Sequence, residues 1–205
     1  MHNSLSRFGL GAALALAVLA SGCGGGGDAG GTATSGTNIP GSQPSNSPSL
    51  PATGIVPMDV ATTCGITDFR NAALQKINAV RAQPRTCGTQ AMPAVGPLTW
   101  NDRLFSSAAR HSADLAAQNY FSHTSKDGRT FDQRIKAEGY NWMVAGENIA
   151  AGYSTIDIVV TKWLESPSHC VNLMTADYAE MGLSCVQQGG TTYGTYWTLD
   201  LGRTY

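Results

Sequence analysis

Glycine and proline are concentrated in the first quarter of this 205-residue chain. Of the 24 glycines, 12 fall in residues 1–57 and the other 12 are spread over the much longer remainder. Five of the nine prolines also precede residue 58. Ordering glycine costs more backbone entropy than ordering any other residue, and proline lacks a backbone hydrogen-bond donor. We therefore expect one folded domain over residues 58–205, preceded by an appendage that is not a packed core.

Residues 1–22 have the composition of an export signal. One cation, Arg7, precedes an unbroken apolar run from Phe8 to Leu19. This order is typical of a secretory signal peptide, and the run is shorter than the roughly 20 apolar residues that span a bilayer. The sequence Leu19-Ala20-Ser21-Gly22-Cys23 resembles the bacterial lipobox. By that resemblance Cys23 would be lipidated and become the mature N-terminus; the alternative is cleavage at the small residues and release.

Residues 23–57 are expected to form a flexible linker. Most positions from 24 to 57 are Gly, Ser, Thr or Pro, and Asp28 is the only charged residue among them. Such a segment buries too little apolar surface to offset its conformational entropy. The linker would hold the domain away from a membrane to which only the lipid on Cys23 attaches it. Gly24, rather than aspartate, fits sorting to an outer membrane if the organism has one.

The charge balance excludes nucleic acid as a main partner. The chain has 13 Lys and Arg against 14 Asp and Glu, a net charge of −1, and no basic block. Nucleic-acid binding requires a clustered cationic face. With 42% hydrophobic and 13% charged residues, the chain is not a disordered acidic or basic polypeptide either.

Four cysteines lie in the expected domain: Cys64, Cys87, Cys170 and Cys185. An even number in an exported chain indicates two disulfides, with three possible pairings. We expect Cys64–Cys87 and Cys170–Cys185, because each pair brackets one local unit. Cys-x-x-Cys is absent, so the sequence supports neither a redox motif nor a zinc ribbon. His169 and Cys170 are neighbours that point in different directions, which argues against a nucleophile dyad.

Hydrophobic periodicity predicts several helices. The cleanest stripe runs over 156–164, with Ser154 as its expected N-cap. The other predicted helices are 67–81 with Thr67 as N-cap, a second opening at Trp100-Asn101-Asp102, 131–138 capped by Thr130 and closed by Gly139, and a short one starting at Ser166-Pro167.

After Met174 the pattern changes to that of strands. Residues 178–187 and 193–201, separated by Gly189-Gly190, predict a β-hairpin. Its second strand would have Trp197, Leu199 and Leu201 on one face and Tyr196, Thr198 and Asp200 on the other. The fold class is therefore α+β.

Three polar residues stand out as candidates for chemistry. His123 and His169 lie in polar, turn-like segments, and Glu147 between them is flanked by glycine and apolar residues. Two imidazoles and a carboxylate can hold a divalent metal with an open coordination position, or exchange a proton with a bound water. Their wide spacing along the chain does not show that they meet, so helix caps or satisfied surface groups remain the alternative. His111, on the apolar side of the second helix, is expected to be a packed core residue.

An ordered series of short motifs resembles one known family. The series is Leu98-Thr99-Trp100-Asn101, the helix with Ala109 and His111-Ser112, Phe121-Ser122-His123, Gly139-Tyr140, Gly146-Glu147-Asn148-Ile149-Ala150, Trp163, Ser166-Pro167-Ser168-His169, Met181-Gly182-Leu183 and Tyr196-Trp197-Thr198. It resembles the bacterial, SCP-like extracellular branch of the CAP superfamily (cysteine-rich secretory proteins, antigen 5 and pathogenesis-related proteins). The match covers roughly residues 66–203.

This resemblance implies an α-β-α sandwich, with a small antiparallel sheet between helices and a solvent-open cleft. It also implies that His123, Glu147 and His169 converge in that cleft, where family members have been found with zinc or another divalent ion. Many animal and fungal members add a second glutamate at the position that Ser166 occupies here. Glu165 is the candidate for that fourth role, but it lies about 100° away around a helix, which leaves a triad open to water.

Three functions are compatible with these residues. The resemblance favours a binding module that engages a sterol, lipid, glycan or protein, because many family members act without demonstrated catalysis. The second is a hydrolase in which a metal-bound water attacks an amide or ester, although His-Glu-x-x-His and Gly-x-Ser-x-Gly are both absent. The third is a purely structural role in the cell envelope.

Overall fold

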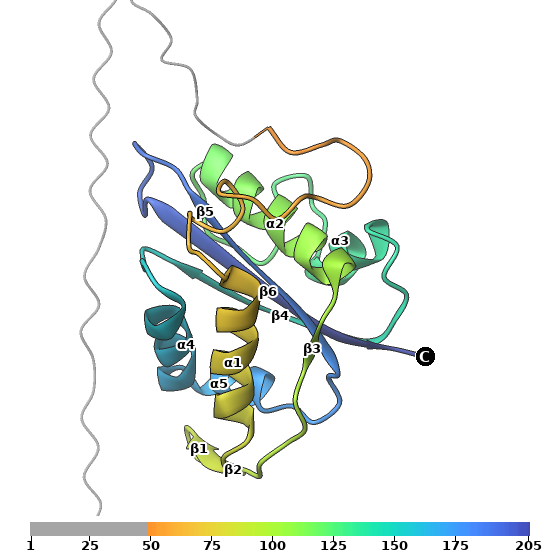
Figure 1. Cartoon of the computed structure of the whole chain (residues 1–205), viewed down its shortest axis with the longest axis vertical. Coiled ribbons are helices and arrows are strands. Elements are labelled where there is room, and N and C mark those ends of the chain that lie inside the picture. The colour runs from red at the N-terminus through yellow and green to blue at the C-terminus, as the bar shows by residue number, and fades with distance from the viewer. Residues whose placement is uncertain (1–48) are drawn as a thin grey trace, which may run out of the picture. The chain divides into compact units, whose positions relative to one another are not determined.

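A four-stranded sheet runs through the middle of residues 49–205, the part of the chain that the computed structural model describes (Figure 1). The strand order is β3 (Thr99–Trp100), β5 (Glu180–Gln187), β6 (Thr195–Thr204) and β4 (Trp142–Ala151). β6 pairs antiparallel with both β5 and β4, and β3 pairs parallel with β5. The predicted hairpin is confirmed as β5–β6. Sequence periodicity did not predict β4, which lies at one edge of the sheet.

Helices cover both faces of the sheet (Figure 1). α1 (Phe69–Arg81), α4 (Ile156–Glu165) and α5 (Pro167–Leu173) lie on one side. α2 (Asp102–Ala117) packs along β5 and β6 on the other side, with α3 (Phe131–Ala137) next to it. A separate small hairpin joins β1 (Arg85–Cys87) to β2 (Gln90–Met92). The expected α+β class and α-β-α sandwich are confirmed.

Two of the predicted helix starts are confirmed by their capping bonds. The Asn101 side chain accepts hydrogen bonds from the backbone N–H groups of Arg103 and Leu104 at the start of α2. Thr130 and Gln133 form a reciprocal capping box at the start of α3. Gly139, just after α3, has φ +78°, the left-handed conformation that glycine adopts without strain.

Two predicted N-caps were wrong by one residue. α1 is preceded by Asp68, in a left-handed conformation and without a side-chain capping bond, rather than by Thr67. α4 is capped by Thr155 rather than Ser154, because the extended backbone of Thr155 directs its hydroxyl to the N–H of Ile158.

The two faces of β6 differ as the alternation predicts. Trp197, Leu199 and Leu201 join an apolar cluster with α1, α4 and α5. On the opposite face the Thr198 hydroxyl accepts a hydrogen bond from Ser112 of α2, and all of these side chains are buried. α2 approaches the sheet so closely at Gly182 of β5 that a Cβ there would collide with the helix backbone. A glycine is therefore required at that crossing.

The predicted disulfide pairing was wrong. The bonds are Cys64–Cys185 and Cys87–Cys170, with sequence separations of 121 and 83. The prediction assumed that cysteines close in sequence are close in space. Instead, residues 62–64 run alongside β5, with the Cys64 N–H bonded to the Cys185 carbonyl at 3.0 Å. Both disulfides therefore join segments far apart in sequence.

The folded unit begins before the expected boundary at residue 58. Val56 is buried, and its N–H donates to the Ser106 hydroxyl of α2 at 3.0 Å. Arg110 of α2 donates to the carbonyls of Pro51 and Gly54 at 2.5 and 2.8 Å. The segment 49–57, expected to be linker, thus packs on α2. The expected signal (1–22), Cys23 and the linker up to residue 48 lie outside the described residues. Within 49–205 no helix has both the length and the apolar character needed to cross a membrane.

The outer edge of β4 is covered by side chains rather than by another strand. The indole N–H of Trp163 in α4 donates to the carbonyl of Ile149 at 3.0 Å. The amide of Asn172 in α5 donates to the carbonyl of Glu147 at 3.1 Å. Both acceptors lie on the strand that ends the sheet, so α4 and α5 occupy part of its pairing edge.

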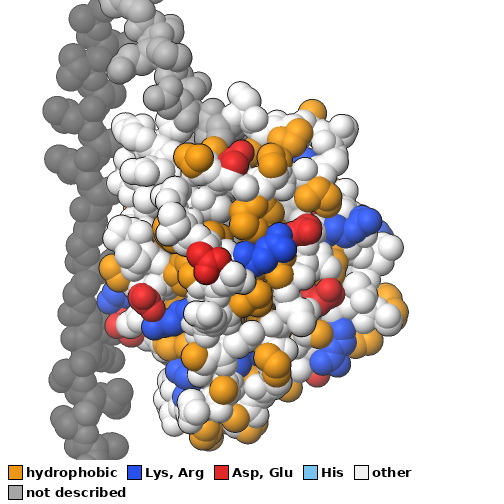
Figure 2. Space-filling view, viewed as in Figure 1, with side chains coloured by type: hydrophobic (Ala, Val, Ile, Leu, Met, Phe, Trp, Pro, Cys, Tyr) orange, Lys and Arg blue, Asp and Glu red, His pale blue; other side chains and the backbone are white. Residues whose placement is uncertain are grey.

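Charged side chains of both signs are interspersed on the face of the molecule in Figure 2, where the cationic and anionic side chains lie side by side. No cationic patch appears on this face, as the near-neutral net charge leads one to expect.

Candidate functional site

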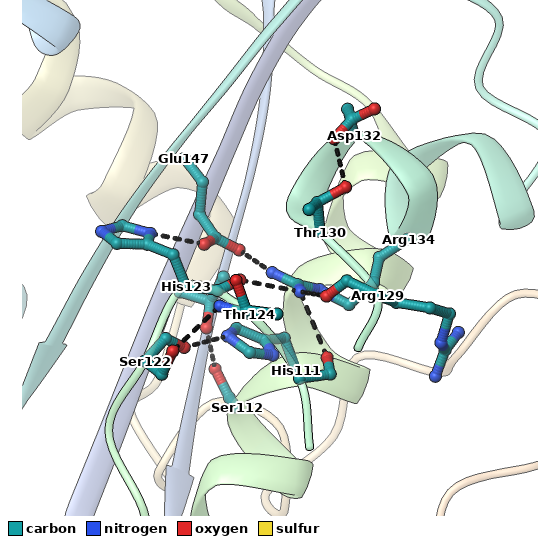
Figure 3. A network of polar contacts seen from close by, with 12 residues as sticks. His111, Ser112, Ser122, His123, Thr124, Arg129, Thr130, Asp132, Arg134 and Glu147 are labelled. Atoms are coloured by element: carbon teal, nitrogen blue, oxygen red, sulfur yellow. Dashed lines mark hydrogen bonds and ion pairs between the residues drawn. The ribbon is translucent and has the colours of Figure 1, made fainter. Parts of the chain in front are cut away.

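The structure brings His123, Glu147 and His169 together from three elements. His123 lies on the loop between α2 and α3, Glu147 in the middle of β4, and His169 on α5. His123 Nδ1 is 2.7 Å from Glu147 Oε1. Figure 3 shows the His123 ring facing this carboxylate. The ring centroids of the two histidines are 6.5 Å apart. The Glu147 side chain is fully buried, whereas that of His123 is 48% exposed, so the histidine faces solvent from a buried carboxylate.

Arg134 holds the other oxygen of Glu147. Its Nη2 lies 2.5 Å from Glu147 Oε2, and only 4% of its side chain is exposed. Its Nη1 donates to the carbonyls of His123 and Arg129 and to the Ser125 hydroxyl, which fixes the loop that carries His123 (Figure 3). Through these bonds Arg134 connects the Glu147 carboxylate to the loop. Removing either partner of such a buried ion pair would leave the other charge uncompensated, which is costly.

The sequence interpretation missed Arg134, although a signal for it was present. α3 begins with Phe131, and Arg134 follows three residues later, next to Ile135. Residues three and four apart lie on one face of a helix. The predicted helix 131–138 thus already placed an arginine beside its apolar stripe, where an unpaired cation would be costly. A buried anionic partner was therefore to be expected.

A second buried carboxyl group lies opposite Glu147. Asp200 of β6 is paired directly with Glu147 in the strand register and is fully buried. Burial, and after it the charge of Glu147, raises the pKa of Asp200 well above its usual range. The protonated form of Asp200 is therefore favoured beside the charged Glu147.

His169 is positioned through its backbone. The Asn148 side chain donates to the His169 carbonyl at 3.1 Å and accepts from Asn172 at 3.0 Å, which ties α5 to β4. Burial, and after it the charge of His123, lowers the pKa of His169. The neutral imidazole, which is the form that binds metals, is therefore favoured.

Glu165 does not join this group. Its carboxylate pairs with Lys162 at 2.7 Å on the surface of α4, where the Glu165 side chain is 57% exposed. Glu165 precedes by one residue the position at which many CAP proteins have their second glutamate. One residue on a helix turns the side chain by about 100°, so Glu165 points away from the histidines.

His111 is a core residue, as predicted. It is fully buried, its Nε2 is 3.0 Å from the carbonyl of Ser122, and burial lowers its pKa to about 4. Since a carbonyl can only accept, Nε2 carries the hydrogen and Nδ1 presents a lone pair.

The donor set for a metal ion is smaller than expected. Within residues 49–205, no three His, Cys, Asp or Glu side chains are arranged to hold an ion. Both oxygens of Glu147 are occupied by His123 and Arg134, which leaves the two imidazoles. With metal–nitrogen bonds of about 2.1 Å, two imidazoles on one ion have centroids about 5 Å (tetrahedral) to about 6.5 Å (collinear) apart. The observed 6.5 Å matches the collinear limit, so a tetrahedral ion would require the two rings to come about 1.5 Å closer together.

A mostly apolar groove of about 280 Å³ lies beside His169. Phe121 and Tyr193, both exposed, form one wall with ring centroids 5.7 Å apart. The rest of the lining comes from Ile149, Ala150, Ala151, Tyr153, Lys162, Trp163 and Ser166. The groove can therefore hold an apolar group next to an imidazole.

Comparison with known proteins identifies the family. The model of the cysteine-rich secretory protein family, CAP, matches residues 74–201, more than half of the chain. The chain belongs to the CAP family. It is 36% identical over 94 residues to the uncharacterised protein YkwD of Bacillus subtilis, covering 45% of this chain and 36% of that protein. It is 35% identical over 86 residues to the uncharacterised membrane protein YlbC of the same organism, covering 42% and 25%. The match thus spans about a third or less of each relative.

Solved structures agree with this assignment. An extracellular protein containing an SCP domain from Bacillus anthracis is 26% identical, with a TM-score of 0.54, over 69% of this chain and 43% of that one. An outer surface protein from Borrelia burgdorferi is 24% identical, with a TM-score of 0.50, over 54% and 80%. The second likeness concerns the fold alone. The expected membership of the CAP family is confirmed.

Proposed function

We propose that this CAP domain is an exported binding module whose cleft takes up a divalent cation through His123 and His169. The observation that carries the proposal is the 2.7 Å contact between His123 Nδ1 and Glu147 Oε1. A carboxylate at Nδ1 fixes the hydrogen on that nitrogen and leaves Nε2 free as a ligand. Glu147 is then a positioning residue for His123 rather than a third ligand.

The buried ion pair supports this assignment of roles. Arg134 neutralises Glu147 and at the same time binds the His123 carbonyl at 2.9 Å, so it holds both the ring and the loop in place. A zinc ion bound there would supply a Lewis acid with open positions for a ligand oxygen. The lowered pKa of His169 keeps the second imidazole available for the ion at neutral pH.

Binding is favoured over hydrolysis by the state of the carboxylates. A metal-dependent hydrolase requires a general base within reach of the bound water. Among the described residues, Glu147 is paired on both oxygens and Glu165 is paired with Lys162 away from the histidines. The apolar groove beside His169 instead suits the apolar part of a lipid or sterol whose polar head reaches the two imidazoles.

Export is supported by two further observations. The two disulfides fit an oxidising compartment. A structural relative is an extracellular protein. We propose that the lipid on Cys23 attaches the domain to the envelope. Mass spectrometry of the mature N-terminus checks this: a diacylglyceryl mass on Cys23 supports the anchor, and an unmodified N-terminus near that residue supports release.

Calorimetric titration of the purified chain with zinc tests the cleft. We expect saturable binding that His123→Ala and His169→Ala abolish, and that Glu147→Gln weakens by about 10- to 100-fold. The control Glu165→Gln changes a carboxylate of the same type on the surface and should leave the affinity unchanged. Wild-type protein without saturable binding, or an equal loss in Glu165→Gln, contradicts the proposal.

The ligand is tested separately. Lipids extracted from the purified chain would be identified by mass spectrometry, with Tyr193→Ser as the groove variant and Tyr205→Ser, at the exposed C-terminus, as its control. Enrichment of one lipid in wild type that only Tyr193→Ser reduces supports the groove. A groove that is empty in every preparation argues for another kind of ligand.

A further inference from the structure

Two exposed aromatic side chains meet at the mouth of the groove beside His169. Phe121, on the loop after α2, is 44% exposed, and Tyr193, on the loop between β5 and β6, is 46% exposed. Their ring centroids are only 5.7 Å apart, and both side chains line the groove. Large apolar side chains that gather at one place on a protein surface mark a site of association with a partner or a membrane.

The two loops that carry this aromatic pair are bonded to each other. The side-chain oxygen of Asn119 accepts hydrogen bonds from the Thr192 N–H at 2.8 Å and from the Tyr196 hydroxyl at 3.1 Å. The Tyr196 ring also packs edge-on against Tyr193, with centroids 5.9 Å apart. Side chains that are already held in place lose little conformational freedom when they bind. The aromatic pair is therefore a preformed surface rather than two independent loop residues.

The described chain begins at the same end of the domain as the aromatic pair. Leu50 packs against a cluster that contains Ala113, near the C-terminal end of α2, and Val186 and Tyr196, on either side of the turn between β5 and β6. Figure 1 shows the first described residues and the β5–β6 loop at the upper end of the domain, away from the C-terminus. An anchor at Cys23 therefore attaches the domain by the end that carries the aromatic pair.

Lysines lie beside the aromatic pair, and carboxylates accompany them. Lys162 lines the groove and pairs with Glu165 at 2.7 Å. Lys126 lies over the ring of Tyr120, 5.2 Å from its centroid, and the Tyr120 hydroxyl donates to Asp114. Lysine stems and aromatic rings are the side chains that suit the boundary between lipid headgroups and hydrocarbon. Because both signs of charge are present, contact with a bilayer should depend on apolar burial rather than on anionic lipid.

We propose that the aromatic pair, Phe121 and Tyr193, rests on the lipid bilayer to which Cys23 anchors the chain. This contact rests on the proposed function, whose lipid anchor it supplements with a second attachment. Two half-exposed rings bind a bilayer weakly on their own, but a tether keeps the surface at a high effective concentration beside the bilayer. In this orientation the groove beside His169 opens towards the lipid, so an apolar chain can enter it without crossing water.

Titration with phosphatidylcholine vesicles tests the contact, using the chain from residue 24 onward. This chain keeps residues 49–205 and lacks both the apolar run of the signal and the lipid. We expect binding at millimolar lipid that added phosphatidylglycerol does not strengthen. Phe121→Ser together with Tyr193→Ser should weaken it by about 10-fold or more, because two half-exposed rings bury about as much apolar surface as one whole aromatic side chain. The control is Met143→Ser, an apolar side chain that is 46% exposed at the opposite end of β4. No binding, binding to phosphatidylglycerol alone, or an equal loss in the control overturns the proposal.

A fluorescent reporter locates the contact without removing an aromatic ring. Vesicles with brominated acyl chains should quench the emission added by Tyr193→Trp and leave that added by Met143→Trp unchanged, each measured against wild type with its own four tryptophans. Quenching of both variants, or of neither, contradicts docking by this surface. The proposed function fails on different results: no zinc binding, an empty groove, or no lipid on Cys23. Vesicle binding by a chain whose groove is empty would leave the docking surface standing and remove only the groove ligand.

Discussion

The two faces of β6 are built from alternate residues of one strand but have different chemistry. On one face Trp197, Leu199 and Leu201 lie in an apolar cluster with α1, α4 and α5. On the other, Thr198 and Asp200 lie under the Ser- and Ala-rich surface of α2. The apolar face stabilises the fold by removing apolar surface from water. This contribution is non-directional and depends mainly on the area buried. The polar face depends on specific partners, and it carries Asp200 and, opposite it in the register, Glu147 of the candidate site.

The two sides of the sheet also differ in where buried polar atoms lack hydrogen-bond partners. Both disulfides lie in or against the apolar cluster. Most of the buried polar atoms that lack a partner within residues 49–205 lie on the α2 side, on Ser107, His111, Arg134 and Asp200; the others are Arg85 Nε on β1 and Gln188 Oε1 just after β5. One layer therefore holds the domain together, and the other retains polar groups that packing alone would disfavour.

The largest expected effect comes from the disulfide of the apolar layer that spans more sequence. Replacing Cys64 and Cys185 by Ala together should lower the free energy of unfolding by about 4 kcal/mol, because the two cysteines are separated by 121 positions in the sequence. Urea unfolding of the double variant measures the loss. Zinc affinity should be unchanged, since the cleft lies on other elements. A loss below about 1 kcal/mol would mean that the apolar cluster holds residues 62–64 without the bond.

Leu199→Ala tests the apolar face directly. The side chain is fully buried in the cluster, so its truncation should cost about 3 kcal/mol. Urea unfolding measures the loss here too. Ala150→Gly, a smaller truncation in the same cluster, should cost less. An equal effect of the two variants would argue that backbone strain, and not burial, dominates this layer.

The polar face should make stability depend on pH through His111. Burial lowers the pKa of His111 to about 4, whereas an unfolded histidine titrates near 6.5. As the pH falls from 6.5 to 4, the unfolded chain takes up a proton that the folded chain refuses. The contribution of His111 to the free energy of unfolding should therefore drop by up to about 3 kcal/mol over that range and stay level above it, whereas the raised pKa of Asp200 acts in the opposite sense. Urea unfolding at pH 7, 5.5 and 4 measures the drop, and His111→Gln should remove it. A pH dependence that is identical in His111→Gln would assign it to other groups.

The smallest expected effect is the loss of one buried hydrogen bond on the polar face. Ser112 donates to Thr198 at 2.9 Å, and Ser112→Ala should cost about 1 kcal/mol. Ser168→Ala, an exposed serine on α5, is the control and should have an effect within about 0.5 kcal/mol. If the Ser112 change costs as much as Leu199→Ala, the two faces are energetically equivalent and the comparison fails.

Local sequence patterns were sufficient for most of the helices and for one hairpin. Asn101, Thr130 and Gly139 mark helix ends through bonds and dihedral angles that depend on nearby residues only. β4 could not be found in this way, because it is covered on both faces and lacks the alternation of apolar and polar residues that marks a half-buried strand. Its partner β6 was read correctly, but both of its faces proved to be buried.

The parts that failed depend on contacts between distant segments. The disulfide pairing requires knowing that residues 62–64 run beside β5, which no local pattern records. The two histidines and Glu147 stood out from their local context, but only the family resemblance indicated that they meet, because their spacing along the chain carries no distance information. Asp200 was placed on the correct face of its strand, but its position beside Glu147 arises only when β6 pairs with β4. The local pattern of α3 indicates a buried arginine, but the partner of Arg134 is fixed only when α3 lies against β4.

The covered edge of β4 bears on how such domains behave when many copies are crowded together. An exposed strand edge is a template on which a second chain can add its own strand. Here the carbonyls of Glu147 and Ile149 are already bound by Asn172 and Trp163, so a neighbouring copy would have to displace both side chains before pairing. The same bonds that fix α4 and α5 beside the cleft therefore protect the domain against edge-to-edge aggregation.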